Sequence, residues 1–273
     1  MFGFLSKGGI PDEGMIHWIL DTFDWLLLET GGWQPFDETP LVLPTDEFFP
    51  VSGRGHELAT RLLELVKKHA GMEEWDCRLV AQADAPNDRE MFGRIPMQST
   101  GASGPAGTFS FNPRSQQVKL TYSPRLLTNP MQLVATLAHE LAHYLIGTTS
   151  EPPPGGVQML EPATDIGAVF IGHGIFAANA AFHYQQYQDG NMHGWEYSRQ
   201  GYLDEQALAY ALGVFIRLKG IDGKAAAHHL KDNPRAYLKD ALKDLDRNRG
   251  GDITDLRERA KSVQVTEGDT TGS

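Results

Sequence analysis

The sequence contains a single cysteine, Cys77, so no intrachain disulfide can form. This composition fits a reducing compartment, and we expect a cytoplasmic protein. The first seven residues are too few for the apolar region of an export signal, and a Gly-Gly pair follows them. The apolar stretch 15–28 is interrupted by the ionisable residues His17, Asp21 and Asp24, so we expect no membrane span.

Basic residues are scarce, because 24 Lys and Arg stand against 35 Asp and Glu, which gives a net charge of −11. This charge argues against nucleic acid or an anionic membrane surface as the main partner, since both repel an acidic protein. In contrast, 41% hydrophobic and 22% charged residues are typical of a globular protein, and 273 residues suffice for a substantial core. The composition leaves the oligomeric state open.

One stretch places three polar residues inside an apolar helix pattern. Residues 133–146 read Leu-Val-Ala-Thr-Leu-Ala-His-Glu-Leu-Ala-His-Tyr-Leu-Ile. On a helix His139 and His143 lie about 40° apart and one turn above each other, so both imidazoles can reach one metal ion. Glu140 projects about 100° from His139 and can touch a ligand of that ion. The His-Glu-x-x-His pattern predicts that the two histidines hold a zinc ion (Zn2+) and that the glutamate acts as general base.

The residues that flank this stretch support a buried helix. Asn129-Pro130 offers an N-cap residue followed by a proline in the first turn, and Gly147 is a C-cap candidate. An alternative interpretation is two core histidines and a partly exposed glutamate. It leaves the buried polar groups without a partner, which is costly.

A catalytic zinc ion needs a third protein ligand and an open position. Glu161 and Asp165 are four residues apart in a segment that is otherwise mostly apolar, so they share one face of a second predicted helix. One carboxylate can bind the metal while the other accepts a hydrogen bond from a liganding histidine. His173 lies about 120° around an ideal helix from Glu161, and we interpret it as a histidine packed at a helix kink.

The pattern His139-Glu140-x-x-His143 followed by Glu161-x-x-x-Asp165 resembles that of the gluzincin metallopeptidases, whose familiar members are thermolysin and neprilysin. The resemblance implies that His139, His143 and Glu161 bind zinc. It also implies that Glu140 activates the metal-bound water and that Asp165 accepts a hydrogen bond from a liganding histidine.

The resemblance covers only about residues 118–180 and does not name a specific peptidase family. The metzincin pattern needs a third histidine shortly after the first helix, and residues 144–150 contain none. Asp165 and His173 stay open as alternatives to Glu161 for the third ligand.

The remaining sequence predicts an α+β fold. Alternating residues in 108–111 and 117–122 predict a hairpin that leads into the helix of His139, and residues 77–81 predict a further strand. Together with the resemblance, this indicates a zincin-like fold. A small mixed or antiparallel sheet then packs on the helix of His139, and a mainly helical C-terminal half follows.

We expect three parts along the chain. Residues 1–55 supply a helix and an extended segment that pack on the core. Residues 56–250 form the zincin-like metallopeptidase domain. Residues 251–273 are polar and rich in charged residues, and we expect a partly disordered tail.

The implied reaction is hydrolysis of a peptide bond in a peptide or protein substrate, with zinc polarising the carbonyl and Glu140 moving the proton. The oxyanion needs a further donor, for which we choose Tyr202 because it opens a predicted helix; His183, His193 and Tyr197 are alternatives. Two other functions are a zinc hydrolase of a non-peptide amide and a non-catalytic zinc-binding module on a zincin-like fold. The presence of Glu140 argues against a purely structural zinc, which needs no base.

Overall fold

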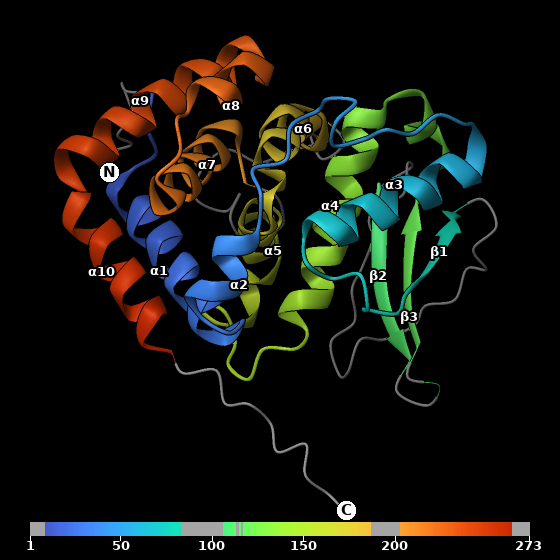
Figure 1. The fold of residues 1–273 in the computed structure, drawn as a ribbon, viewed down its shortest axis with the longest axis horizontal. Coiled ribbons are helices and arrows are strands. Elements are labelled where there is room, and N and C mark those ends of the chain that lie inside the picture. The colour runs from blue at the N-terminus through green and yellow to red at the C-terminus, as the bar shows by residue number, and fades with distance from the viewer. Residues whose placement is uncertain (1–8, 83–105, 113–114, 116, 187–202, 264–273) are drawn as a thin grey trace, which may run out of the picture.

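Helix α4 (Pro130–Ile146) lies between a small β-sheet and a larger group of helices (Figure 1). It begins where the sequence predicts, because the Asn129 side chain accepts a hydrogen bond from the Gln132 N–H at 3.3 Å. It ends at Gly147, whose N–H donates to the carbonyl of His143 at 2.9 Å. Most of its residues are buried, so elements pack on several sides of it.

The computed structural model describes residues 9–82, 106–112, 115, 117–186 and 203–263. Besides α4, the α-helices in these ranges are α1 (Glu13–Glu29), α2 (Trp33–Glu38), α3 (Gly55–His69), α5 (Leu160–Ala168), α6 (Gly174–Gln186), α7 (Glu205–Lys219), α8 (Lys224–His229), α9 (Asp232–Asn248) and α10 (Gly250–Ser262). Shorter helical turns are η2 (Pro124–Thr128), η3 (Val157–Met159) and η4 (Val169–His173). Within the described ranges, no helix has both the length and the apolar character needed to cross a membrane.

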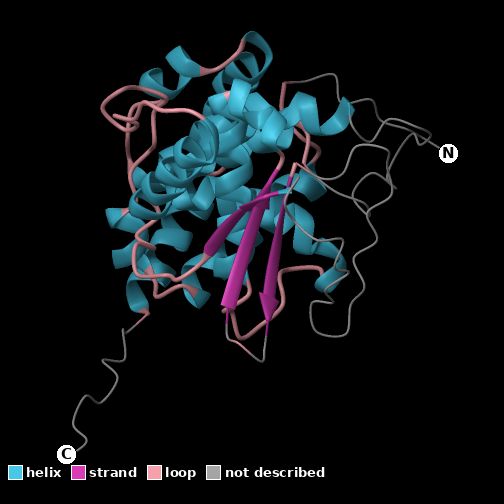
Figure 2. Ribbon diagram, turned by 90° about the vertical axis from the view of Figure 1, so that its right-hand side faces the viewer, coloured by secondary structure: helices cyan, strands magenta, loops and turns pink. Residues whose placement is uncertain are grey.

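Three strands form a mixed sheet in the order β1–β3–β2, made of β1 (Arg78–Ala81), β2 (Gly107–Asn112) and β3 (Gln117–Tyr122). Strands β2 and β3 pair antiparallel, with Phe109 opposite Leu120, which confirms the predicted hairpin. Strand β1 runs parallel to β3. Figure 2 shows this sheet beside the helices. Because β2 and β3 contact α4, the sheet and the predicted metal-binding helix form one unit of a mixed, mostly helical fold.

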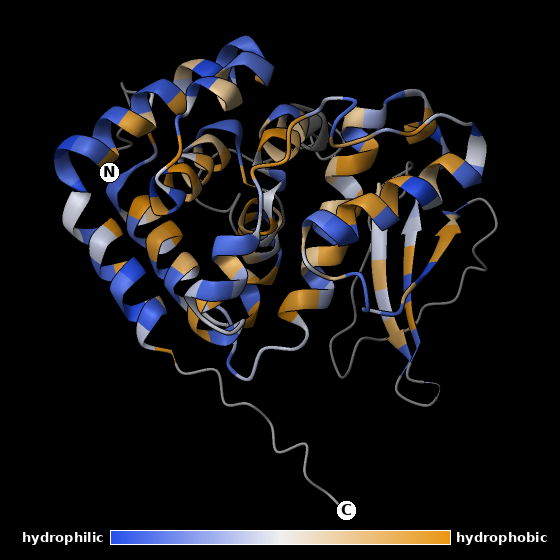
Figure 3. Cartoon of the chain, in the orientation of Figure 1, coloured by the Kyte–Doolittle hydropathy of each residue, from blue (hydrophilic) through white to orange (hydrophobic). Residues whose placement is uncertain are grey.

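The helical group packs around apolar residues that belong to the same core as α4 and the sheet. Helices α1, α7 and α10 contact one another, and α9 covers α7. The Phe36 ring of α2 lies 5.0 Å from the ring of Phe170 in η4 and 5.3 Å from that of Phe215 in α7. The outer faces of α9 and α10 are mostly hydrophilic (Figure 3), as expected for helices that cover a core on one side.

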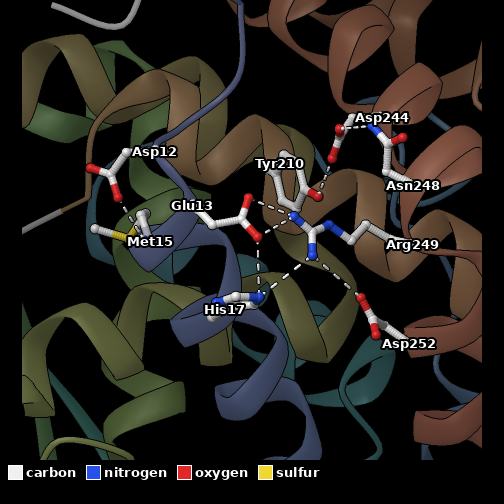
Figure 4. Close-up of polar contacts among 9 residues, drawn as sticks. All are labelled: Asp12, Glu13, Met15, His17, Tyr210, Asp244, Asn248, Arg249 and Asp252. Atoms are coloured by element: carbon white, nitrogen blue, oxygen red, sulfur yellow. Dashed lines mark hydrogen bonds and ion pairs between the residues drawn. The ribbon is translucent and has the colours of Figure 1, made fainter. Parts of the chain in front are cut away.

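Arg249, between α9 and α10, joins the two ends of the described chain (Figure 4). Its Nη2 donates to both carboxylate oxygens of Glu13 at 2.6 Å, so α10 is tied to the start of α1. Beside it, the Tyr210 hydroxyl of α7 donates to Asp244 of α9 at 2.7 Å. These contacts fix α1 and α7 against the C-terminal helices.

The structure corrects the predicted boundary at residue 251. Residues 250–262 form α10, which buries Ile253, Leu256 and Ala260. These residues recur every three or four positions and give a narrow apolar stripe, which the high charge of the segment conceals in the sequence. Residues 264–273 of the predicted tail lie outside the described residues. The short helix α2 was not predicted either.

Candidate metal centre

Helices α4 and α5 bring three of the predicted ligands together. The Nε2 atoms of His139 and His143 each lie 3.5 Å from Oε2 of Glu161. One donor atom from each of the three residues lies within 4.8 Å of the other two. His139 is buried, whereas 28% of the Glu161 side chain is exposed, so the cluster is reached from the side of Glu161. These three residues can hold a metal ion.

A contact between small residues allows the two helices to lie this close. A β-carbon on Gly167 of α5 would lie 3.0 Å from Cβ of Ala142 and 3.4 Å from Cδ1 of Ile146, both on α4. A larger side chain at position 167 would therefore push α5 away from α4. Because Glu161 is on α5, its distance from the histidines depends on this packing.

Helix α1 holds the connection between α4 and α5. The indole N–H groups of Trp18 and Trp25 donate to the carbonyls of Pro154 at 2.8 Å and Glu151 at 3.2 Å. The backbone N–H and the hydroxyl of Ser150 donate to Glu29 Oε2 at 2.7 Å and 2.8 Å. The N-terminal helix thus restrains the loop that joins the two ligand helices.

Each histidine of the cluster has a hydrogen-bond partner on α5. His139 Nδ1 lies 3.0 Å from Asp165 Oδ1, and His143 Nδ1 lies 3.2 Å from Thr164 Oγ1. The other oxygen of Asp165 accepts a hydrogen bond from the N–H of Leu203 at 2.6 Å. The sequence pattern indicates Asp165 but does not single out Thr164. Its position three residues after Glu161, on the same helix face, was the available signal.

Glu140 is buried, with 3% of its surface exposed. Its Oε2 has no hydrogen-bond partner among the residues that the structure describes. Its Oε1 faces Gly107 of β2, where a β-carbon would lie only 2.7 Å away. Burial, with the neighbouring Glu161 as a smaller cause, raises the pKa of Glu140, while His139 and His143 oppose the rise. The carboxylate is therefore a better proton acceptor than an exposed glutamate.

Charge interactions within the cluster outweigh burial. Burial by itself lowers the pKa of His139, but the hydrogen bonds with Asp165 and Glu161 raise it well above its usual value. Burial by itself raises the pKa of Glu161, but the hydrogen bonds with His139 and His143 hold it far below its usual range. Glu161 is consequently ionised and able to bind a cation.

Comparisons with known proteins give no indication of function, so a function must be inferred from this geometry. No family model matches the chain, and searches of curated proteins and of solved structures find no match. The resemblance to gluzincins therefore stays a prediction. Its support comes from the contacts of His139, Glu140, His143, Glu161 and Asp165.

His173 is not part of the cluster that can hold a metal ion. The residue before it, Gly172, has a φ of 90°, and a β-carbon there would collide with the carbonyl oxygen of Pro40. His173 is fully buried at this bend, and its Nδ1 donates to the carbonyl of Ile171 at 2.9 Å. This confirms the interpretation of His173 as a histidine packed at a helix kink.

The predicted oxyanion donor, Tyr202, lies outside the described residues. The same holds for His193, for Tyr197 and for the side chain of His183. The described chain resumes at Leu203, whose N–H donates to Asp165. The described chain therefore resumes beside Asp165, the hydrogen-bond partner of His139.

Proposed function

We propose that the cluster binds zinc and that the protein is a zinc-dependent metallopeptidase with a zincin-like fold. Two imidazole nitrogens and one carboxylate oxygen form a ligand set that zinc uses in catalytic sites. Tetrahedral zinc with bonds of about 2.0–2.1 Å separates its ligand atoms by roughly 3.4 Å. The separation of 3.5 Å between each histidine Nε2 and Glu161 Oε2 fits this geometry.

The buried carboxylate of Glu140 is the observation that most favours a catalytic zinc site over a structural one. A structural zinc site is closed by four ligands, whereas a catalytic site has three and leaves one position for water or substrate. The described cluster offers three residues that could act as ligands. Beside it, Glu140 holds a buried oxygen without a hydrogen-bond partner in the described part of the chain. A buried polar atom of this kind is costly unless a ligand or water pairs with it, so Glu140 has a role in binding one.

When bound, zinc lowers the pKa of a water molecule and polarises the scissile carbonyl. Glu140 takes a proton from the attacking water and later delivers it to the leaving amine. Its raised pKa suits a group that must gain and then lose a proton. Asp165 accepts the Nδ1–H of His139, which makes Nε2 the nitrogen that would bind the metal.

The position of β2 favours a peptide as the substrate. This strand pairs with β3, and the described residues place no strand along its other edge. It packs on α4, with Gly107 against Glu140 and the Phe109 ring 6.2 Å from the ring of His143. An extended peptide can add to such an edge through main-chain hydrogen bonds.

The test combines metal content with turnover. Untagged protein is purified, zinc per chain is measured, and cleavage of a mixture of unstructured peptides is followed by mass spectrometry. We expect about one zinc per chain in the parent protein. Glu140→Gln should keep the zinc and lose at least about 100-fold in turnover, because it lacks the base. Glu161→Ala should lose or weaken zinc binding.

Glu57→Gln, on the exposed face of α3, is the matched control and should keep both zinc and turnover. A parent protein that binds no zinc even after reconstitution would remove the proposal. Equal turnover in Glu140→Gln and the parent would show that Glu140 is not the base. Zinc binding without peptide cleavage would favour a hydrolase of another amide or a non-catalytic zinc module.

A further inference from the structure

One face of α5 carries three residues that contact the histidines of α4. Glu161, Thr164 and Asp165 are spaced i, i+3 and i+4, so they lie on the same side of the helix. Glu161 faces both Nε2 atoms, and Asp165 and Thr164 each contact one Nδ1 atom. The role of Thr164 is not explained by the ligand set or by the general base.

We infer that Thr164 is a positioning residue that holds His143 in the tautomer and ring orientation needed to bind the metal ion. This inference rests on the metal centre proposed above. It deepens that proposal because it assigns the second histidine a partner on α5, as Asp165 is the partner of the first.

The direction of the hydrogen bonds supports this role. The Thr164 hydroxyl has one proton and lies 2.8 Å from the carbonyl oxygen of Leu160, which can only accept. The hydroxyl therefore donates to Leu160 and accepts from His143 Nδ1, which lies 3.2 Å away. Nδ1 of His143 then carries a proton, which leaves Nε2, the nitrogen that faces Glu161, to bind the metal ion.

Burial prevents water from competing for this hydrogen bond. Thr164 has 0% of its surface exposed, so water does not replace its hydroxyl as the acceptor for His143. Without the hydroxyl, the Nδ1–H of His143 would lose its partner in the described part of the chain. The neutral ring could then move its proton to Nε2, which would block the metal-binding nitrogen.

A simpler role for Thr164 is the bond to its own helix, because buried threonines often donate to the carbonyl four residues earlier. The chain offers a matched case on α1. The Thr22 hydroxyl donates to the carbonyl of Trp18 at 2.7 Å, and Thr22 is also 0% exposed. Thr22 and Thr164 thus share burial and the bond within the helix, but only Thr164 contacts a histidine of the cluster.

The experiment measures zinc affinity by competition with a chelating dye for the parent, Thr164→Val, Thr164→Ser and Thr22→Val. Valine keeps the shape of threonine and removes the hydroxyl, whereas serine keeps the hydroxyl. We expect Thr164→Val to bind zinc about 10–100-fold more weakly, as is usual when the partner of a liganding histidine is lost. Thr164→Ser should restore most of the affinity, and Thr22→Val should bind zinc like the parent.

The visible spectrum of the cobalt(II)-substituted protein gives a second readout, because it reports ligand geometry directly. It should change in Thr164→Val and not in Thr22→Val. If Thr164→Val does not fold, Thr164→Ala removes the same hydroxyl without a branched side chain and takes its place. Parental affinity and an unchanged cobalt spectrum in the hydroxyl-free variant would overturn the inference. A parent that binds no zinc would instead refute the metal centre itself.

Discussion

Gly107 of β2 lies directly against the carboxylate of Glu140 of α4. A β-carbon at position 107 would lie 2.7 Å from Glu140 Oε1, 2.7 Å from Cγ2 of Thr136 and 2.9 Å from the carbonyl oxygen of Thr121. No side chain can be added at this position without displacing one of these groups. The edge strand and the proposed general base are therefore positioned by the same contact.

Gly107→Ala should reduce turnover by about 100-fold, because displacement of a catalytic group by about 1 Å is enough for such a loss. Zinc content should not change, since the atoms nearest to a β-carbon at position 107 belong to Glu140, Thr136 and Thr121 and not to the three proposed ligands. The measurement is the rate of peptide cleavage beside the zinc content of the same preparation.

Gly251→Ala is the matched control, because a β-carbon at position 251 meets no atom within 4 Å. It should keep parental turnover. Loss of zinc together with turnover in Gly107→Ala would show that β2 supports the whole cluster and not Glu140 alone.

Removal of the metal should lower the thermal stability of the protein. Zinc at 100 times its dissociation constant should contribute about 2.7 kcal/mol, because it binds the folded chain and much less the unfolded one. The melting temperature is measured with zinc and with a chelator. The shift should persist in Glu140→Gln, which keeps all three ligands, and vanish in His139→Ala. A shift of parental size in His139→Ala would show that zinc binds elsewhere.

The protein should become less stable as the pH falls below about 6.5, in part because of His173. Burial, together with the nearby His69, lowers the pKa of His173 to about 3, although its hydrogen bond to Ile171 acts in the opposite direction. Between the unfolded value of about 6.5 and the folded value, the unfolded chain binds a proton that the folded chain does not. One such proton lowers the free energy of unfolding by about 1.4 kcal/mol for each unit by which the pH falls.

The measurement is the free energy of unfolding from pH 7.5 to 4.5 in a chelator, so that metal binding does not contribute. His173→Asn keeps a side-chain N–H donor and removes the titrating group, so its stability should fall less steeply with acid. His17→Asn replaces a side chain that is 59% exposed, and its free energy of unfolding should fall with acid as steeply as that of the parent protein. If parent and His173→Asn lost stability with the same slope, His173 would not be the titrating group.

Local patterns predicted much of the fold. The apolar pattern of residues 133–146 and the cap residue Asn129 predicted α4, because the cap lies within one turn of the helix it begins. Residue alternation likewise predicted the β2–β3 hairpin. The same reasoning missed α10, since its three buried residues are few among many charges. Only packing against α1 and α7 shows that they form a core face.

For the site, the sequence by itself determined that His139, Glu140 and His143 share one helix and that Glu161 and Asp165 share another, because helix geometry fixes the spacing within each element. The tertiary structure decided which residues from different helices and strands lie side by side, because sequence spacing does not determine this. It placed Glu161 and not His173 beside the two histidines, because Gly167 lets α5 approach α4 and Gly172 bends the chain after it. It also placed Thr164 beside His143 and Gly107 beside Glu140. These contacts join residues from different elements, so they depend on how side chains pack between helices and strands.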